Sequence, residues 1–152
     1  FLYRAPKLHL SPLNTGTMAL NYVNNLGISK ESALDMAKLT KGYPYAFQLL
    51  GYLAYEKEGD YKAVLPAFKQ SLEEYVYEKI WSELSKADRE VLIAMAKTGT
   101  GKVSEIREKL GYDSNHFNPY RMRLIRKGII EGETYGYVSF TLPLFDEFVL
   151  EQ

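Results

Sequence analysis

Four cations lie close together near the C-terminus and carry the clearest chemical signal in the chain, namely Arg121, Arg123, Arg126 and Lys127. Arginine and lysine at helical spacing neutralise DNA phosphates and contact base edges. Asn118 and Pro119 can begin a helix around them, because asparagine caps helices and proline is tolerated at the first helical position. Gly128 can end that helix in the left-handed conformation. The segment therefore predicts a short basic helix.

A run rich in glycine, aromatic and β-branched residues, 129–140, follows this predicted helix. Such a run is typical of a two-stranded hairpin. A helix followed by a hairpin is the second half of a winged helix-turn-helix domain, whose helix usually enters a DNA major groove. Tyr135 and Tyr137 lie on the predicted hairpin, or wing, and aromatic rings of this kind stack on bases. We expect both tyrosines to contact DNA beside the four cations.

The four cations can also be explained without DNA binding. Acidic residues follow the predicted helix, so the basic face could be solvated and pair with Glu131 and Glu133. The whole chain has 19 basic and 19 acidic residues, so any attraction to nucleic acid must come from a local patch. Winged domains also dock onto proteins. DNA contact and protein docking therefore both remain open.

Several other kinds of site are excluded or disfavoured. The chain has no cysteine, which excludes disulfides and thiolate metal sites. Its two histidines, His9 and His116, lie far apart and do not form a spaced zinc-ligand set. The segment 99–102 lacks the glycine and hydroxyl positions of a phosphate-binding loop, so we interpret it as a turn. We predict no catalytic residue and no metal site in this chain.

The predicted elements fall into two parts. Asn14 or Thr15 is expected to cap a helix that runs to about Asn25, and Ser29 a second helix that ends at Gly42. A glycine–proline corner at Gly42, Tyr43 and Pro44 then begins an almost wholly apolar helix, which should be the centre of its bundle. Further along, Ser85 is expected to cap the helix at 86–97. A long helix is expected to begin at Pro66 and to link the two parts. The following helices, 86–97 and 104–110, complete a winged helix with the basic helix and wing. We expect a mainly α chain, with a helical bundle at 1–84 and a winged-helix domain at 85–152.

Two separated stretches are similar to one family. The corner Gly42-Tyr43-Pro44-Tyr45 with Phe47-Gln48-Leu49-Leu50-Gly51 resembles the helical lid of prokaryotic STAND-type AAA+ ATPases, which are related to archaeal origin-recognition proteins. The N-terminal Phe1-Leu2-Tyr3-Arg4 with Leu8-His9-Leu10-Ser11-Pro12-Leu13 is similar to the passage from the ATPase core into that lid. The tail around Phe140, Pro143 and Phe145 also resembles the family's winged domain. The resemblance implies that residues 1–11 are a remnant of the core.

The resemblance implies a regulatory fragment of an ATP-binding protein. Gly42, Tyr43 and Pro44 would lie near ATP, held with Mg²⁺ by a core that precedes this chain. The chain by itself would hydrolyse nothing, whereas its parent would be an ATPase. We expect double-stranded DNA, the missing N-terminal core, and a second copy bound through that core as partners, in the cytoplasm and away from membranes. The alternatives are a docking or autoinhibitory winged module without DNA binding, and a stand-alone transcription regulator.

Overall fold

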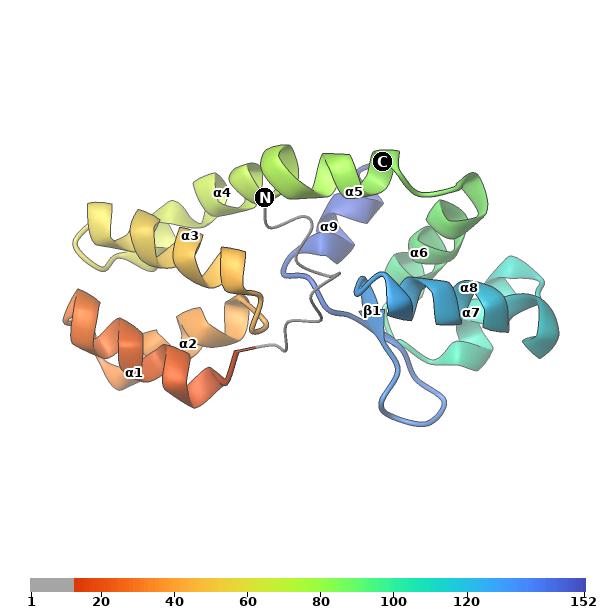
Figure 1. The fold of residues 1–152 in the computed structure, drawn as a ribbon, viewed down its shortest axis with the longest axis horizontal. Helices are drawn as coiled ribbons and strands as arrows, with labels where there is room; N and C mark the ends of the chain where they lie inside the picture. Colours follow the sequence, from red (N-terminus) through yellow and green to blue (C-terminus); the bar gives the residue numbers. More distant parts are fainter. Residues whose placement is uncertain (1–12) are drawn as a thin grey trace. The chain divides into compact units, whose positions relative to one another are not determined.

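The computed structural model describes residues 13–152, so the expected core remnant, 1–11, lies outside the described residues. The chain divides into two compact units, Phe1–Val76 and Tyr77–Gln152. The described residues are mainly helical and include a small two-stranded antiparallel sheet (Figure 1). In the part of the chain that is described, no helix has both the length and the apolar character needed to cross a bilayer.

Four helices build the described part of the N-terminal unit: α1 Thr15–Leu26, α2 Lys30–Leu39, α3 Pro44–Glu56 and α4 Tyr61–Leu72. Helix α1 packs against α2 and α3, and α3 packs against α4. Their inward faces form a core of fully buried side chains, which includes Met36, Leu50, Phe68 and Leu72. The predicted caps of the first two helices are confirmed, because Asn14 accepts from the Thr17 N–H and Ser29 from the Ser32 N–H.

Helix α3 is less buried than its apolar sequence predicted. It buries Ala46, Leu50 and Ala54 on one side, whereas Tyr52 and Tyr55 are mostly exposed. Tyrosine can expose its ring edge and hydroxyl, so an apolar count overstates how much of such a helix is covered. The helix expected at the centre of the bundle thus packs on both α1 and α4 but leaves one side open to solvent.

A five-residue π-helical segment, Glu73–Tyr77, follows α4 and leads into the short α5 Glu78–Ser82. The prediction that Pro66 begins a long helix was wrong, because α4 begins at Tyr61 and contains that proline. Asp60 caps α4 by accepting from the Ala63 N–H at 3.4 Å. The division between the units also lies before Leu84, where the sequence placed the boundary.

Residues 77–84 belong with the C-terminal unit because their aromatic rings pack there. The Tyr77 ring meets the Phe145 ring edge-on at 4.9 Å between centroids, and the Trp81 ring meets Phe148 at 6.1 Å. The buried Tyr77 hydroxyl donates to the Pro143 carbonyl. These contacts join the segment to α9 Phe145–Leu150, which packs on α6.

The rest of the C-terminal unit has α6 Lys86–Thr98, α7 Val103–Leu110 and α8 Ser114–Arg126, followed by β1 Ile130–Glu131 and β2 Ser139–Phe140. The predicted hairpin is confirmed: the strands pair antiparallel, with Ile130 opposite Phe140. Lys102, just before α7, forms an antiparallel bridge with Tyr137 on the hairpin. The cap predicted for α6 is also confirmed, since Ser85 accepts from the Asp88 N–H at 3.1 Å.

Helix α8 begins earlier than the sequence predicted. Asp113 caps it by accepting from the His116 N–H at 2.8 Å, and Pro119 lies inside the helix. The assignment of Asn118 as the cap and Pro119 as the first residue was therefore wrong. A proline near a helix start removes only one backbone hydrogen bond, so a strong cap upstream can override the proline signal.

Candidate nucleic-acid interface

Helix α8 has one buried side and one open side. Phe117 and Leu124 are buried and fix the helix on the unit. The exposed side chains recur at helical spacing and form what we call the open stripe, which comprises Asn115, Asn118, Pro119, Met122 and Arg126. Since positions three and four apart share a helix face, these residues form one continuous surface along α8.

Arg123, one of the four cations predicted to contact DNA, faces α6 and is held there. Its Nε donates to Oδ2 of Asp88 at 3.0 Å and its Nη2 to Oδ1 at 2.7 Å. Asp88 is only 2% exposed, so the guanidinium supplies the charge that this buried carboxylate needs. These hydrogen bonds raise the pKa of Arg123, which also lies 5.1 Å above the Tyr120 ring. Arg123 therefore joins α8 to α6.

Arg121 is also engaged within the unit. Its Nη2 donates to the Gly132 carbonyl at 3.2 Å, which joins α8 to the start of the hairpin turn. A Cβ at position 132 would meet the end of the Arg121 side chain, so the guanidinium would have to move aside. Arg121 is half-buried, and its Nη1 donates to Sδ of Met122 at 3.8 Å, so its guanidinium lies beside the open stripe.

Arg126 and Lys127 remain exposed, and neither forms an ion pair within residues 13–152. They lie where α8 ends, and the turn is closed by hydrogen bonds from Gly128 N–H to Ile125 O and from Ile129 N–H to Leu124 O. Gly128 adopts φ of 76°, the left-handed conformation predicted for it. Cations at this position are favoured by the helix dipole, and here they also face solvent.

The hairpin tip carries the two predicted tyrosines. Tyr135 is 99% exposed and Tyr137 is 44% exposed. The tip is tied to the start of α7, since Val103 N–H donates to Gly136 O at 2.9 Å and Val138 N–H donates to Gly101 O at 2.8 Å. A fixed backbone thus presents an open Tyr135 ring to solvent.

The sequence reasoning missed a stack of three rings beside α8. Tyr112 and His116 stack with centroids 3.7 Å apart, and Tyr120 lies 5.9 Å from Tyr112. Burial raises the pKa of Tyr112, followed by the influence of Tyr120 and Glu90. The spacing of these aromatic residues by four positions was the available signal. The stack steadies the first turn of α8, where Asn115 and Asn118 lie.

The three residues of the predicted nucleotide corner lie together between α2 and α3. Gly42 adopts φ of 75°, and its carbonyl accepts from the Leu13 N–H at 2.9 Å. Tyr43 N–H donates to Thr40 O at 2.9 Å, and Pro44 begins α3 as predicted. Burial, with a smaller contribution from Tyr45, raises the pKa of Tyr43 to about 12. The corner is thus a fixed turn in which Gly42 is buried and Tyr43 and Pro44 are half-buried.

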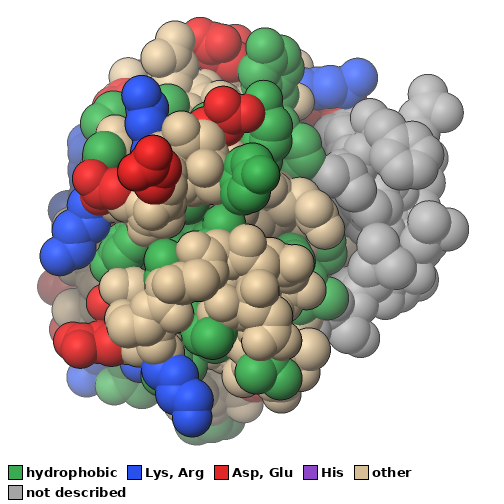
Figure 2. All heavy atoms as spheres, turned by 90° about the vertical axis from the view of Figure 1, so that its left-hand side faces the viewer, with side chains coloured by type: hydrophobic (Ala, Val, Ile, Leu, Met, Phe, Trp, Pro, Cys, Tyr) green, Lys and Arg blue, Asp and Glu red, His purple; other side chains and the backbone are tan. Residues whose placement is uncertain are grey.

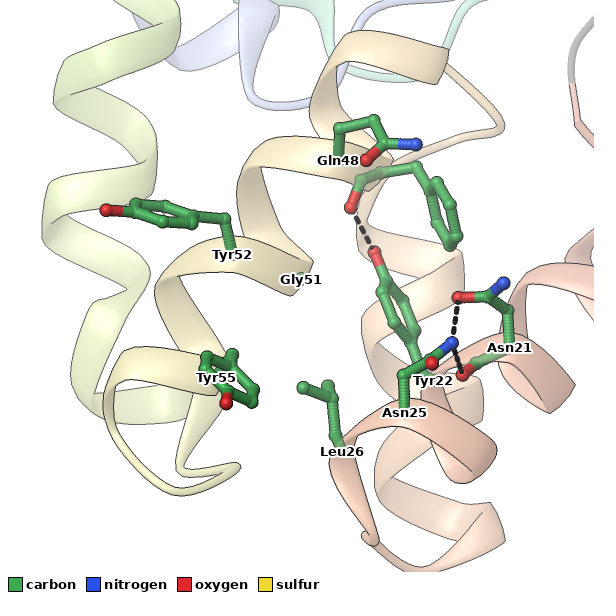
Figure 3. A pocket seen from close by; sticks show the side chains of 9 residues that line it. Asn21, Tyr22, Asn25, Leu26, Gln48, Gly51, Tyr52 and Tyr55 are labelled. Atoms are coloured by element: carbon green, nitrogen blue, oxygen red, sulfur yellow. Dashed lines mark hydrogen bonds between the residues drawn. The ribbon is translucent and has the colours of Figure 1, made fainter.

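A separate open groove of about 390 Å³ lies between α1 and α3. In Figure 3, Leu26 on α1 and Tyr55 on α3 lie across the groove from each other, and the Tyr22 side chain extends from α1 to α3, where its hydroxyl donates to the Phe47 carbonyl at 2.7 Å. Its lining is uncharged, and the face of the N-terminal unit in Figure 2 carries its charged side chains mostly toward the edges. The groove does not include the corner at Gly42, Tyr43 and Pro44, so it does not mark the predicted nucleotide position.

Among residues 13–152, no cluster of three or more histidines and carboxylates is arranged to hold a metal ion. Residues 74–149 match the family described as "Domain of unknown function (DUF8462)". No curated protein and no solved structure matches the chain.

Proposed function

We propose that the C-terminal unit of this chain, which belongs to the family described as "Domain of unknown function (DUF8462)", is a winged helix that binds double-stranded DNA. The proposal rests on the geometry of that unit. The observation that carries the proposal is the open stripe of α8, with the hairpin tip exposed on the same unit. The order α6, bridge at Lys102, α7, α8 and hairpin supports the winged-helix assignment. In such domains the equivalent helix lies in the major groove.

The proposed contacts differ from those the sequence indicated. Arg126 and Lys127 reach phosphates at the end of α8, and Tyr135 contacts the backbone or an adjacent groove. Arg123 is assigned to holding α8 on α6, because Asp88 uses two of its nitrogens. Arg121 supports the hairpin through Gly132.

The proposed DNA binding is weak and depends modestly on salt. Each neutralised phosphate contributes about −0.9 to the slope of log K against log salt. Two cations, Arg126 and Lys127, therefore predict a slope of about −2 for duplex DNA. The C-terminal unit has nearly equal numbers of acidic and basic residues, so little further attraction is expected from its overall charge.

For the N-terminal unit we propose the role of an AAA+ lid in a STAND-type ATPase. The support is the fixed corner at Gly42, Tyr43 and Pro44, in which Tyr43 and Pro44 keep part of their side-chain surface exposed. No cation belongs to this three-residue corner, so phosphates and Mg²⁺ would be held by a core outside this chain. The lid would couple ATP binding in that core to the C-terminal unit.

A second candidate, protein docking through the same surface, is favoured by one observation. Met122 and Tyr135 are exposed apolar groups on α8 and the hairpin, while two of the four cations are engaged within the unit. Aromatic residues and methionine are enriched in protein interfaces. This candidate predicts little duplex binding.

The test is a titration of fluorescent duplex DNA with the full chain at several salt concentrations. The double variant Arg126→Ala/Lys127→Ala should lower the affinity and bring the slope close to zero. The matched control Lys30→Ala/Lys62→Ala removes two exposed charges from the N-terminal unit and should change neither quantity. Absence of salt-dependent binding by the unaltered chain would refute DNA binding and favour docking.

A further inference from the structure

We infer that α8 reads A·T base pairs in the major groove, with Asn115 and Asn118 contacting adenine and Met122 contacting the thymine methyl group. The inference rests on the DNA binding proposed above and adds the class of sequence that is preferred. It follows from which side chains on the open stripe are available for contact and which are engaged elsewhere.

Asn118 is available because it does not cap α8. The cap is Asp113, whose Oδ1 accepts from His116 N–H at 2.8 Å, so the Asn118 amide keeps both its donor and its acceptor. Asn14 shows the contrast, since its side chain is used to cap α1. The side chains of Asn115 and Asn118 are exposed and make no hydrogen bond within residues 13–152. An asparagine amide pairs with adenine N6 and N7 through two hydrogen bonds.

The two arginines in the middle of α8, Arg121 and Arg123, are engaged in contacts within the C-terminal unit. Arginine and lysine are the usual partners of guanine O6 and N7. The Arg123 guanidinium is held by Asp88 and that of Arg121 by the Gly132 carbonyl. On the open stripe the only cation is Arg126, at its C-terminal end. The half of the stripe nearest the helix start therefore offers amides and apolar groups.

Apolar contacts on the stripe fit thymine. Met122 is 43% exposed, with its Sδ accepting from Nη1 of Arg121 at 3.8 Å, and Pro119 is exposed beside it. Apolar side chains favour the C5-methyl group that thymine places in the major groove. From Asn115 to Met122 the helix rises about 10 Å, at ~1.5 Å per residue. That length matches about three base steps of ~3.4 Å. We therefore expect a preference for a short A·T run.

The experiment compares two duplexes of equal length, one with a central A·T run and one with G·C in the same positions. The unaltered chain should bind the A·T duplex about 5- to 50-fold more tightly. Replacing adenine by 7-deazaadenine removes the N7 acceptor, and replacing thymine by uracil removes the methyl group. Each replacement should weaken binding several-fold without altering the protein, so misfolding cannot explain the loss.

Variants then assign the contacts. Asn118→Ala should lower affinity for the A·T duplex and leave the G·C duplex and the salt slope unchanged. Met122→Ala should lose the distinction between thymine and uracil. Asn24→Ala, at an exposed position of α1, is the matched control and should change nothing.

Two negative results of the binding experiment would lead to different conclusions. Salt-dependent binding of equal strength to both duplexes would overturn the base preference and leave DNA binding intact. If neither duplex binds, the proposed function and this inference both fail. Equal losses on both duplexes for Asn118→Ala would make Asn118 a phosphate contact and overturn its assigned role.

Discussion

Substitution of Arg123 by alanine should destabilise the C-terminal unit strongly, although the side chain lies on a helix with an open surface. The change leaves both oxygens of Asp88 without the guanidinium that now pairs with them. Removing one partner of a buried ion pair costs about 3–5 kcal/mol. Since the Arg123 side chain is 40% exposed, water can enter and replace part of the interaction. We therefore expect a loss of about 2–3 kcal/mol.

Tryptophan fluorescence gives a direct assay. Trp81 is the single tryptophan of the chain and lies in the C-terminal unit, so urea unfolding followed by its emission reports on that unit. A loss of this size would lower the midpoint of thermal unfolding by about 10–20 °C in a unit of this length. Arg126→Ala is the matched control, and at its exposed position the change should stay within about 0.5 kcal/mol.

A second substitution tests the stated cause. In Asp88→Ala/Arg123→Ala no buried carboxylate is left without a partner, so the double variant should recover part of the stability lost in Arg123→Ala. The reasoning would be refuted if Arg123→Ala and Arg126→Ala had equal effects. It would also be refuted if the double variant lost the sum of the two single losses.

Two further predictions concern a glycine pair and a tyrosine. Gly101→Ala should destabilise the C-terminal unit more than Gly99→Ala. Both glycines have positive φ, but a Cβ at 101 would lie 2.5 Å from the Val138 carbonyl oxygen, whereas a Cβ at 99 would meet open space. Urea unfolding followed by Trp81 emission measures the difference, and equal losses of stability would contradict the proposed clash. Burial raises the pKa of Tyr43 to about 12, so unfolding, which returns it to about 10, should become easier as pH rises between these values and not below them. Circular dichroism of the chain and of Tyr43→Phe should show a smaller decline in the variant.

Much of the fold could be predicted from local chemistry. Ser29 and Ser85 were predicted as caps because such side chains accept from backbone N–H groups, and the structure confirms both; of the two candidates for the first cap, Asn14 and Thr15, Asn14 is the cap. The hairpin followed from glycine punctuation and β-branched residues. These features depend on neighbours within a few positions, which is the range that a sequence pattern reports.

Prolines misled the reasoning twice in the same way. Pro66 and Pro119 were taken as helix starts, but each lies six residues after an aspartate cap, Asp60 and Asp113. Proline is suited to the first turn, and the rule does not say whether a stronger cap lies further upstream. An aspartate six residues before a proline was the signal that could have corrected both boundaries.

The sequence could not show which of the four cations are engaged within the unit, because this depends on contacts between residues that are far apart in the chain. Arg123 meets Asp88 across 35 positions, and the two lie on different helices. From the sequence, Arg121, Arg123, Arg126 and Lys127 were equivalent cations. Only the packing of α8 on α6 and the hairpin separates the engaged cations from the exposed ones.

The proline inside α8 has a consequence for how that helix opens. Without an N–H at position 119, the Asn115 carbonyl receives no hydrogen bond from one turn ahead. The first turn is then held mainly by the Asp113 cap and by the stacked rings of Tyr112 and His116. Amide hydrogens of residues 114–118 should exchange with solvent sooner than those of 122–126, so the beginning of α8 can adjust its course while its end stays anchored.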